Sequence, residues 1–298
     1  MLAQQMTWRS FRYSANDGLS LHARDYGSRE APGTPLVCLP GLTRSSGDFH
    51  DIADALANDD DNPRRVVCFD YRGRGQSDYD RNWRNYTPAR ELDDILTGMT
   101  AAGIGHASIL GTSRGAMIAL FMAAVRPAAM NAVVLNDFGP EIEPKGLARI
   151  KGYVTREPHI PRSWDAAAES LKRIHGAHFP QMSEGDWLRY AHQTYREVDG
   201  KPALDYDKNL ARTLEGLDLD DAPPTMWPQF DALAHIPTLA LRGENSDILS
   251  ADCLAEMVDR HEGLKTFTVP RQGHAPLLWD KVTIGKVAAF LAEHDRVA

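Results

Sequence analysis

Short apolar runs alternate along the chain with stretches of helical periodicity. Near the start, Trp8–Tyr13 and Leu19–Tyr26 flank Asn16-Asp17-Gly18, a sequence typical of a β-hairpin turn. The later apolar runs are continuous, as in strands of a parallel sheet that is buried on both faces. Further strands are predicted at Leu36–Leu39, Arg65–Asp70, His106–Leu110, Ala132–Asn136, Pro237–Leu241 and Lys265–Val269, and helices at Phe49–Ala57, Thr87–Met99, Ala116–Val125, Ala251–Asp259 and Lys281–His294. This alternation predicts an α/β fold on a mostly parallel sheet.

The alternation stops between about Glu141 and Gln229. No buried strand is predicted there, and helices are predicted at Trp164–His175, Ser183–Arg196 and Tyr206–Leu214. An all-helical insertion in a parallel sheet is expected to lie over the strand ends as a cap. We therefore predict a core domain of residues 1–140 and 230–298 and a helical cap of residues 141–229.

The segment Gly111-Thr112-Ser113-Arg114-Gly115 joins a predicted strand to a predicted helix. A sharp turn in this context exposes a serine side chain at the helix N-terminus, and the glycines give the strand and the helix room to cross. Gly-x-Ser-x-Gly is weak by itself, but the strand before it and the helix after it predict that Ser113 is a nucleophile.

A serine hydroxyl needs a base that is held by an acid. His274 and Asp247 each follow a predicted strand by a short loop, and parallel strands end at one edge of the sheet. We therefore predict that Ser113, His274 and Asp247 converge. Asp137, after another strand of the same edge, and Glu244 are the alternative acids.

Acyl transfer also requires donors for a developing oxyanion, commonly two backbone amides. The amide of Arg114 directly follows the nucleophile, and the loop Pro40-Gly41-Leu42-Thr43-Arg44 follows a predicted strand. We predict an oxyanion hole formed by the N–H groups of Leu42 and Arg114.

Taken together, these motifs resemble those of α/β-hydrolase-fold serine hydrolases. The resemblance implies a mostly parallel, eight-stranded type of sheet flanked by helices, a helical lid, and a triad of Ser113, Asp247 and His274 with an oxyanion hole from Leu42 and Arg114. The chain departs from many members in having Pro40 before the glycine and Arg114 after the nucleophile. The matching segments are Leu39-Pro40-Gly41-Leu42, Asp70–Ser77, Gly111–Gly115, Gly243–Asp247 and Gln272-Gly273-His274.

Several side chains have two interpretations. The Arg114 guanidinium either grips a substrate carboxylate or pairs with an acid such as Asp48 or Asp137. Aromatic side chains of the insertion either line a substrate pocket or pack the cap onto the core. The substrate-binding candidates are Arg44, Trp83, Trp164 and Trp187, and the further aromatic candidates are Tyr86, Tyr190, Tyr195 and Trp227.

The predicted reaction is hydrolysis of carboxylic esters or lactones through an acyl-enzyme at Ser113. The main alternative is C–C bond hydrolysis of a vinylogous diketone acid. This reaction would need Arg114 or Arg44 to bind the carboxylate of the substrate. Acyl transfer, perhydrolysis and a non-catalytic ligand receptor on the same fold are further alternatives. The fold alone does not choose between them.

Composition narrows the expected partners. Hydrophobic residues make up 43% of the 298 residues, and 33 basic against 41 acidic residues give a net charge of −8, which disfavours nucleic acid and anionic membranes. Three cysteines without CxxC spacing, and no apparent signal peptide or membrane span, favour a soluble cytoplasmic protein.

We expect a small-molecule ester or lactone as its partner, and no cofactor. His175 and His178 lack a third metal ligand, and no nucleotide-binding motif is present. The sequence does not indicate the oligomeric state.

Overall fold

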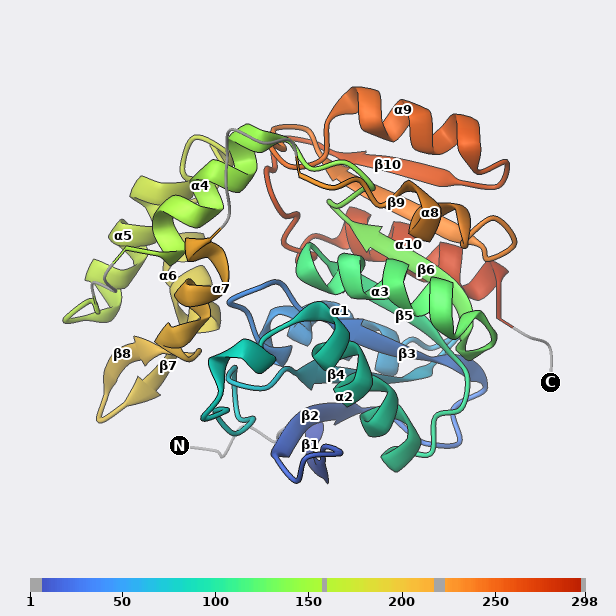
Figure 1. Cartoon of the computed structure of the whole chain (residues 1–298), viewed down its shortest axis with the longest axis horizontal. Coiled ribbons are helices and arrows are strands. Elements are labelled where there is room, and N and C mark those ends of the chain that lie inside the picture. The colour runs from blue at the N-terminus through green and yellow to red at the C-terminus, as the bar shows by residue number, and fades with distance from the viewer. Residues whose placement is uncertain (1–6, 157–159, 217–222, 296–298) are drawn as a thin grey trace.

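An eight-stranded sheet lies at the centre of the computed structural model, which describes residues 7–156, 160–216 and 223–295 (Figure 1). The first hairpin pairs antiparallel within itself and with β4, and the other neighbours in the sheet are parallel. This confirms the predicted α/β fold and its mostly parallel sheet. The strands, in their order across the sheet, are β1 (Trp8–Ser14), β2 (Ser20–Tyr26), β4 (Arg64–Asp70), β3 (Gly33–Leu39), β5 (Ala107–Thr112), β6 (Met130–Asn136), β9 (Thr238–Gly243) and β10 (Lys265–Val269).

Helices cover both faces of the sheet (Figure 1). Successive side chains of β3 enter opposite cores: Val37 and Leu39 belong to one apolar cluster, and Leu36 and Cys38 belong to the other. Burial on both faces explains why the central strands read as continuous apolar runs. The first cluster is covered by α2 (Pro88–Ala101), α3 (Arg114–Val125), α8 (Trp227–Asp231) and α9 (Ala251–Arg260), and the second by α1 (His50–Ala57) and α10 (Lys281–Glu293).

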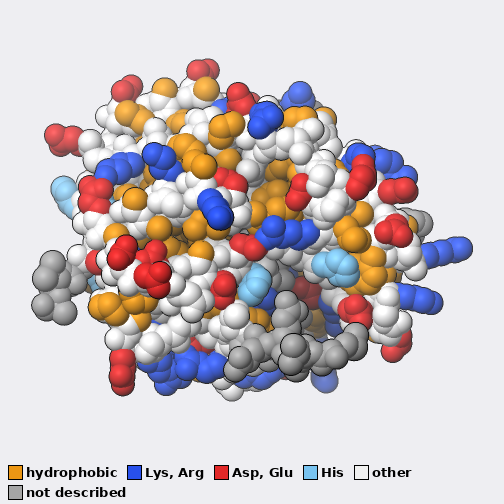
Figure 2. Space-filling view, turned by 180° about the vertical axis from the view of Figure 1, so that it is seen from behind, with side chains coloured by type: hydrophobic (Ala, Val, Ile, Leu, Met, Phe, Trp, Pro, Cys, Tyr) orange, Lys and Arg blue, Asp and Glu red, His pale blue; other side chains and the backbone are white. Residues whose placement is uncertain are grey.

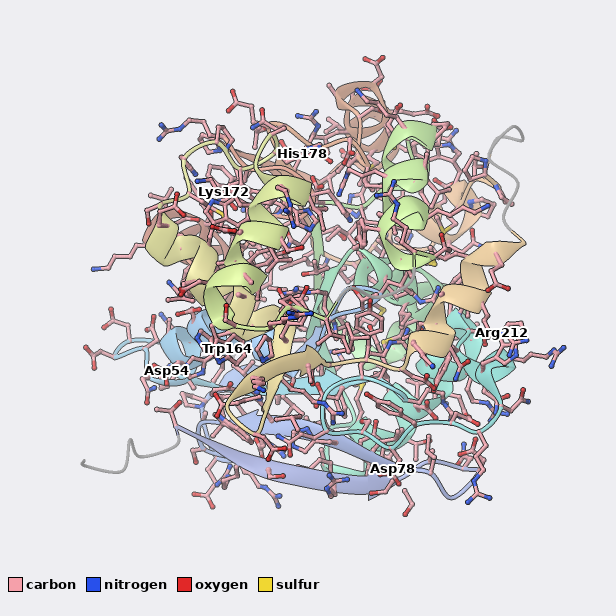
Figure 3. The ribbon with its side chains drawn as sticks, turned by 90° about the vertical axis from the view of Figure 1, so that its left-hand side faces the viewer. Asp54, Asp78, Trp164, Lys172, His178 and Arg212 are labelled. Carbon is pink, nitrogen blue, oxygen red and sulfur yellow. The ribbon has the colours of Figure 1, made fainter. Side chains whose placement is uncertain are left out.

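A separate layer, which we call the cap, lies between β6 and α8 in the chain (Figure 1). It has its own apolar cluster, which includes Leu171, Phe179 and Trp187. Figure 3 faces this layer and shows Trp164 and Lys172 on one helix and His178 in the turn beyond it. The elements of the cap are α4 (Pro144–Val154), α5 (Trp164–His175), α6 (Glu184–Thr194), β7 (Tyr195–Val198), β8 (Lys201–Leu204) and α7 (Arg212–Glu215).

The expectation that the insertion is all helical is wrong, because β7 and β8 form an antiparallel hairpin. Asp199 and Gly200 make its turn with φ angles of 50° and 75°, the left-handed geometry of a tight hairpin turn. The helix α8, which straddles the predicted boundary at residue 229, packs on the core through Trp227 and Phe230.

Two sets of contacts fasten the cap to the core. The segment beyond β8 pairs with the turn after β4, where the Asp207 amide donates to the Gly73 carbonyl at 2.7 Å and the Gly75 amide donates to the Asp205 carbonyl at 2.8 Å. Elsewhere, Arg149 of α4 and Arg189 of α6 form ion pairs with core carboxylates. The cap is therefore held to the core by backbone pairing and by charged pairs.

The surface carries both signs of charge, interspersed over the face drawn in Figure 2. No helix of the described residues is both long enough and apolar enough to cross a membrane.

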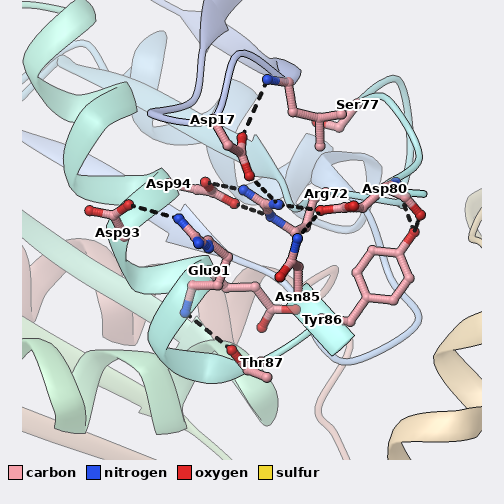
Figure 4. A network of polar contacts seen from close by, with 12 residues as sticks. Asp17, Arg72, Ser77, Asp80, Asn85, Tyr86, Thr87, Glu91, Asp93 and Asp94 are labelled. Atoms are coloured by element: carbon pink, nitrogen blue, oxygen red, sulfur yellow. Dashed lines mark hydrogen bonds and ion pairs between the residues drawn. The ribbon is translucent and has the colours of Figure 1, made fainter. Parts of the chain in front are cut away.

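One buried arginine joins three segments at the side of the sheet near the first hairpin (Figure 4). The Arg72 side chain is fully buried and makes two bonds of 2.7 Å to Asp94 of α2. It also pairs with Asp17 of the β1–β2 turn at 2.9 Å and with Asp80 of the loop after β4. Because a buried charge must be compensated, this arginine links the hairpin, the loop and α2.

We expect the substitution Arg72→Met to lower the free energy of unfolding by about 3–5 kcal/mol, because it leaves the buried Asp94 carboxylate without its partner. Urea unfolding measures this change. Arg90→Met is the matched control: Arg90 is 38% exposed and pairs with Asp93 at 3.7 Å, so its loss should cost no more than about 0.5 kcal/mol. Equal losses in the two variants would contradict the role assigned to Arg72.

Candidate active site

Ser113 stands at the turn between β5 and α3 with a φ angle of 52°. The turn is tight because α3 crosses close to β3: a Cβ atom at Gly115 would lie 1.9 Å from the Leu39 carbonyl oxygen. A Cβ at Gly111 would lie 2.4 Å from the Ala116 amide nitrogen. Only glycine fits at both positions, which explains the Gly-x-Ser-x-Gly sequence. The strained turn points the serine out of the sheet edge, as expected of a nucleophile elbow.

A chain of hydrogen bonds joins this serine to a histidine and a carboxylate. His274 Nε2 lies 2.8 Å from Ser113 Oγ, and His274 Nδ1 lies 2.8 Å from Asp137 Oδ2. Asp137 follows β6 directly and is fully buried. Its carboxylate also accepts hydrogen bonds from the Gly243 amide at 2.7 Å and from Ser246 Oγ at 2.6 Å. Because the carboxylate lies beside Nδ1, it can hold the imidazole in the tautomer with hydrogen on Nδ1.

The expectation that Asp247 is the acid beside His274 is wrong in this structure. Asp247 instead accepts two hydrogen bonds from Arg149 of the cap, at 2.6 and 2.8 Å. Burial raises the pKa of Asp247, but the bonds from Arg149 outweigh burial, so that its pKa is lowered. The other alternative, Glu244, is exposed and accepts from the Arg271 amide at 2.6 Å. Of the three carboxylates considered from the sequence, Asp137 is the one bound to the histidine.

The Arg114 side chain pairs with an acid, as one of its two interpretations holds, but the acid is Glu91 rather than Asp48 or Asp137. Arg114 Nε donates to Glu91 Oε2 at 2.8 Å, and Arg74 forms an ion pair with Glu91 Oε1 at 2.9 Å. Arg74 also donates to the Leu42 carbonyl at 2.9 Å. Burial raises the pKa of Glu91, but the two guanidinium groups outweigh burial and lower it.

This buried Arg74–Glu91–Arg114 network connects the two segments that carry the predicted oxyanion hole. Arg114 begins α3 directly after the nucleophile, and Leu42 lines the same cavity as Ser113. The network therefore holds the Leu42 loop relative to the N-terminus of α3. That the amides of Leu42 and Arg114 bind an oxyanion stays a prediction.

A cavity of about 530 Å³ lies between the sheet edge and the cap, within the size range of small-molecule sites. Ser113 and His274 line its floor, Leu42 and Arg44 line one side, and the apolar side chains include Ile150, Leu171 and Leu277. The cap also contributes polar rings. Tyr190 and Tyr195 are among the aromatic candidates from the sequence, whereas Tyr153, His175 and Tyr206 were not predicted to lie in a pocket.

Of the four predicted substrate-binding residues, only Arg44 lines this cavity. Its charge is already offset by two hydrogen bonds to Asp48, at 2.6 and 2.7 Å. Trp187 is 1% exposed in the apolar cluster of the cap. Trp164 stacks on His192 at 3.8 Å between ring centroids, and Trp83 lies against Arg84 and Arg212. The three tryptophans therefore pack the structure rather than face Ser113.

A mostly parallel eight-stranded sheet with a serine at a strand-to-helix turn, beneath an inserted cap, defines the class of α/β hydrolases. The chain belongs to this family: the model of the alpha/beta hydrolase fold family matches residues 34–281. An α/β hydrolase of Novosphingobium aromaticivorans, known as a crystal structure, is 40% identical with a TM-score of 0.87, and the match covers 96% of this chain and 98% of that one.

Two relatives of assigned activity are also similar to the chain. The 3-hydroxybutyrate-oligomer hydrolase of Cupriavidus necator is 30% identical over 283 residues, covering 91% of this chain and 93% of the relative. The 2-(acetamidomethylene)succinate hydrolase of Mesorhizobium japonicum is 27% identical over 258 residues, covering 86% and 85%. Both relatives are named as hydrolases, and this chain is a hydrolase of the same α/β family.

Labelling of Ser113 with a fluorophosphonate tests the hydrogen-bonded chain without knowledge of the substrate. We expect Asp137→Asn to slow labelling by about a thousandfold or more, because the imidazole loses the acceptor that holds its tautomer. Asp247→Asn, the matched control, should stay within about tenfold of wild type. Intact mass spectrometry follows the reaction, and Ser113→Ala should take up no label. A larger loss in Asp247→Asn than in Asp137→Asn would restore Asp247 as the acid.

For Arg114→Met we expect kcat/KM to fall by about tenfold, and by the same factor for neutral esters and for esters that carry a carboxylate. The reason is that the guanidinium is bound to Glu91 and positions the turn rather than a substrate charge. Arg126→Met, an exposed arginine beyond the other end of α3, should leave kcat/KM unchanged. A loss confined to carboxylate-bearing esters would instead assign Arg114 to substrate binding.

Proposed function

We propose that this protein is a serine hydrolase that cleaves carboxylic esters through Ser113, His274 and Asp137. The observation that carries the proposal is the continuous chain of hydrogen bonds, 2.8 Å at each side of His274, at the floor of a cavity of small-molecule size. This arrangement supplies a nucleophile, a base that it can reach, and an acid that orients the base.

In the proposed reaction His274 takes the Ser113 proton as the hydroxyl oxygen attacks the ester carbonyl. Asp137 stabilises the imidazolium that forms. The amides of Leu42 and Arg114 receive the negative oxygen of the tetrahedral intermediate. The intermediate collapses, and the leaving alcohol takes the proton from His274. Water, activated by His274, then attacks the acyl-enzyme and releases the acid.

Short esters of hydroxy acids are the substrates that we favour. The support is the similarity, over more than nine-tenths of both chains, to a hydrolase of 3-hydroxybutyrate oligomers. The cavity combines apolar side chains with several polar rings, and such a lining suits a chain of alternating hydrocarbon and ester groups. Lactones of similar size present the same carbonyl chemistry.

A second candidate is hydrolysis of an unsaturated acid, by C–C bond cleavage or a related reaction. It is favoured by the similarity to the hydrolase of 2-(acetamidomethylene)succinate, and by Arg156 and Arg173, which are exposed and line the cavity. The sequence suggested that Arg44 or Arg114 binds the substrate carboxylate, but Arg44 is bound to Asp48 and Arg114 is bound to Glu91. We therefore place this reaction second.

The three free cysteines are buried, which fits the reducing conditions of the cytoplasm. We propose that the protein acts there on a small-molecule ester. The proposed reaction involves no nucleic acid, membrane or cofactor.

Pre-steady-state release of p-nitrophenol from acyl esters of increasing length tests the proposal. We expect wild type to give a burst equal to the enzyme concentration, which reports a serine acyl-enzyme, and Ser113→Ala to give none. Hydrolysis of 3-hydroxybutyrate dimers and trimers, followed by chromatography, then tests the favoured substrates. Identical slow release from both proteins would reject ester hydrolysis and turn attention to the unsaturated acids.

A further inference from the structure

Two tyrosine side chains of the cap line the cavity that holds Ser113. Tyr153 of α4 and Tyr190 of α6 are both half-buried. In the part of the chain that the structure describes, neither hydroxyl hydrogen-bonds to another residue, and neither belongs to the oxygen atoms that are buried without a partner. Each hydroxyl therefore keeps accessible surface and can bind a ligand.

The rings of both tyrosines are fixed by their neighbours. His175 packs edge-on against both, with ring centroids 5.7 Å from Tyr153 and 6.0 Å from Tyr190. Trp187 packs edge-on against Tyr190 at 6.1 Å, and the Arg44 guanidinium lies 4.9 Å from the centroid of the same ring. A phenylalanine would make the same ring contacts. Packing therefore accounts for the two rings but not for their hydroxyl groups.

The two hydroxyls are surrounded by protein on the sides away from the cavity. Burial is the largest cause that raises the pKa of Tyr153, to about 12, against the opposing charges of Arg149 and Arg44. Burial likewise raises the pKa of Tyr190, again against Arg44. A hydroxyl that is enclosed in this way and still keeps accessible surface faces the cavity that its ring lines. Both groups also remain neutral O–H donors at physiological pH.

The two hydroxyls lie near each other. The Tyr190 hydroxyl is close enough to raise the pKa of Tyr153 further. A carbonyl oxygen has two lone pairs, so it can accept a hydrogen bond from each of two neighbouring donors. When a ligand displaces water from such donors, a carbonyl replaces the lost hydrogen bonds, whereas an alkyl chain leaves the donors unpaired. A lining of apolar side chains with two O–H donors thus suits a hydrocarbon chain that carries a carbonyl group.

We propose that Tyr153 and Tyr190 are specificity-determining residues, whose hydroxyl groups donate hydrogen bonds to a carbonyl oxygen of the substrate beyond the ester bond that Ser113 attacks. The site thereby selects oligoesters, whose acyl chain carries a second ester group, over alkyl esters of the same length. This inference rests on the proposed ester hydrolysis and names the substrate class of that site.

The test compares p-nitrophenyl 3-acetoxybutyrate with p-nitrophenyl 3-methylhexanoate. The two esters share the leaving group, the chain length and the methyl branch, and only the first carries a second ester group. The measured quantity is the ratio of kcat/KM for p-nitrophenol release from the two esters, after subtraction of the release by Ser113→Ala. The variants are Tyr153→Phe, Tyr190→Phe and the double variant, which lose the hydroxyl oxygens and keep the rings.

Tyr79→Phe is the matched control, because Tyr79 is 41% exposed in the loop after β4 and does not line the cavity. It undergoes the same chemical change, the loss of one phenol oxygen. This variant should therefore keep the ratio of wild type.

We expect wild type to prefer the acetoxy ester by about tenfold. Each single variant should lower the ratio by about threefold through a higher KM for the acetoxy ester, and the double variant should bring the ratio close to one. For the alkyl ester, kcat/KM should not fall, because its chain makes no use of the hydroxyls. Since both hydroxyls stay protonated, the ratio should be constant from about pH 6 to about pH 8. An equal loss on both esters in the two single variants would overturn the proposal.

A binding experiment separates failure of this inference from failure of the proposed function. Methyl 3-acetoxybutyrate and methyl 3-methylhexanoate are titrated into Ser113→Ala and into the variant that also carries Tyr153→Phe and Tyr190→Phe, and chemical shifts of the ligand report binding. If wild type hydrolyses neither p-nitrophenyl ester, ester hydrolysis fails, whereas weaker binding of the acetoxy ester alone on loss of the hydroxyls still supports recognition. Unchanged binding of the acetoxy ester, or no binding of it by Ser113→Ala, rejects the role of the two tyrosines.

Discussion

The arrangement of the site depends on how one buried carboxylate is satisfied. Asp137 receives hydrogen bonds from His274, from the Gly243 amide and from Ser246 Oγ, all within 2.8 Å. A fully buried charge that lost these donors would be strongly destabilised, so the end of β6, the end of β9 and the loop with His274 are held in one arrangement. The position of the imidazole over Ser113 follows from that arrangement.

With Asp137 in this role, Asp247 is free to fasten the cap. It takes both hydrogen bonds from Arg149, and its backbone lies so close to α4 that a Cβ at Gly146 would be 2.0 Å from the Asp247 carbonyl oxygen. Ser246 and Asp247, adjacent in the chain, thus bind the acid of the site and the cap respectively. One short loop after β9 therefore couples the placement of the cap to the placement of His274.

The sequence alone predicted the structure correctly where that structure follows from the apolar pattern or from the lack of room for a side chain. The alternation of apolar runs predicted the sheet, and the glycines around Ser113 predicted the turn, because only glycine fits so close to Leu39 and Ala116. The acid was not predictable in the same way. Asp137 and Asp247 both follow strands that end at one edge, and what separates them is Arg149, which lies 98 residues before Asp247 in the chain.

The insertion shows the same division between local and long-range causes. Asp199-Gly200 is a local signal of a hairpin, but the flanking strand Tyr195–Val198 is largely exposed and lacks the apolar alternation that would reveal it. Trp187 and Ala191 are one helical turn apart and both are buried, so the helical stripe of α6 could have assigned Trp187 to packing. The cavity side chains of the cap come from three helices, the β7–β8 hairpin and the segment beyond it, and no sequence pattern brings them together.

The charges of the cavity also bear on how it can discriminate between ligands. Arg44 is offset by Asp48, and Arg114 is bound to Glu91 and is not among the residues that line the cavity. An arginine that is already paired gives little binding energy to a second carboxylate, because the first pair would have to be broken or shared. Discrimination inside such a cavity must then come from shape and from neutral polar atoms, which are costly to leave unpaired. Arg156 and Arg173, exposed on the cavity lining, add positive charge there, and such charge favours the approach of anionic molecules.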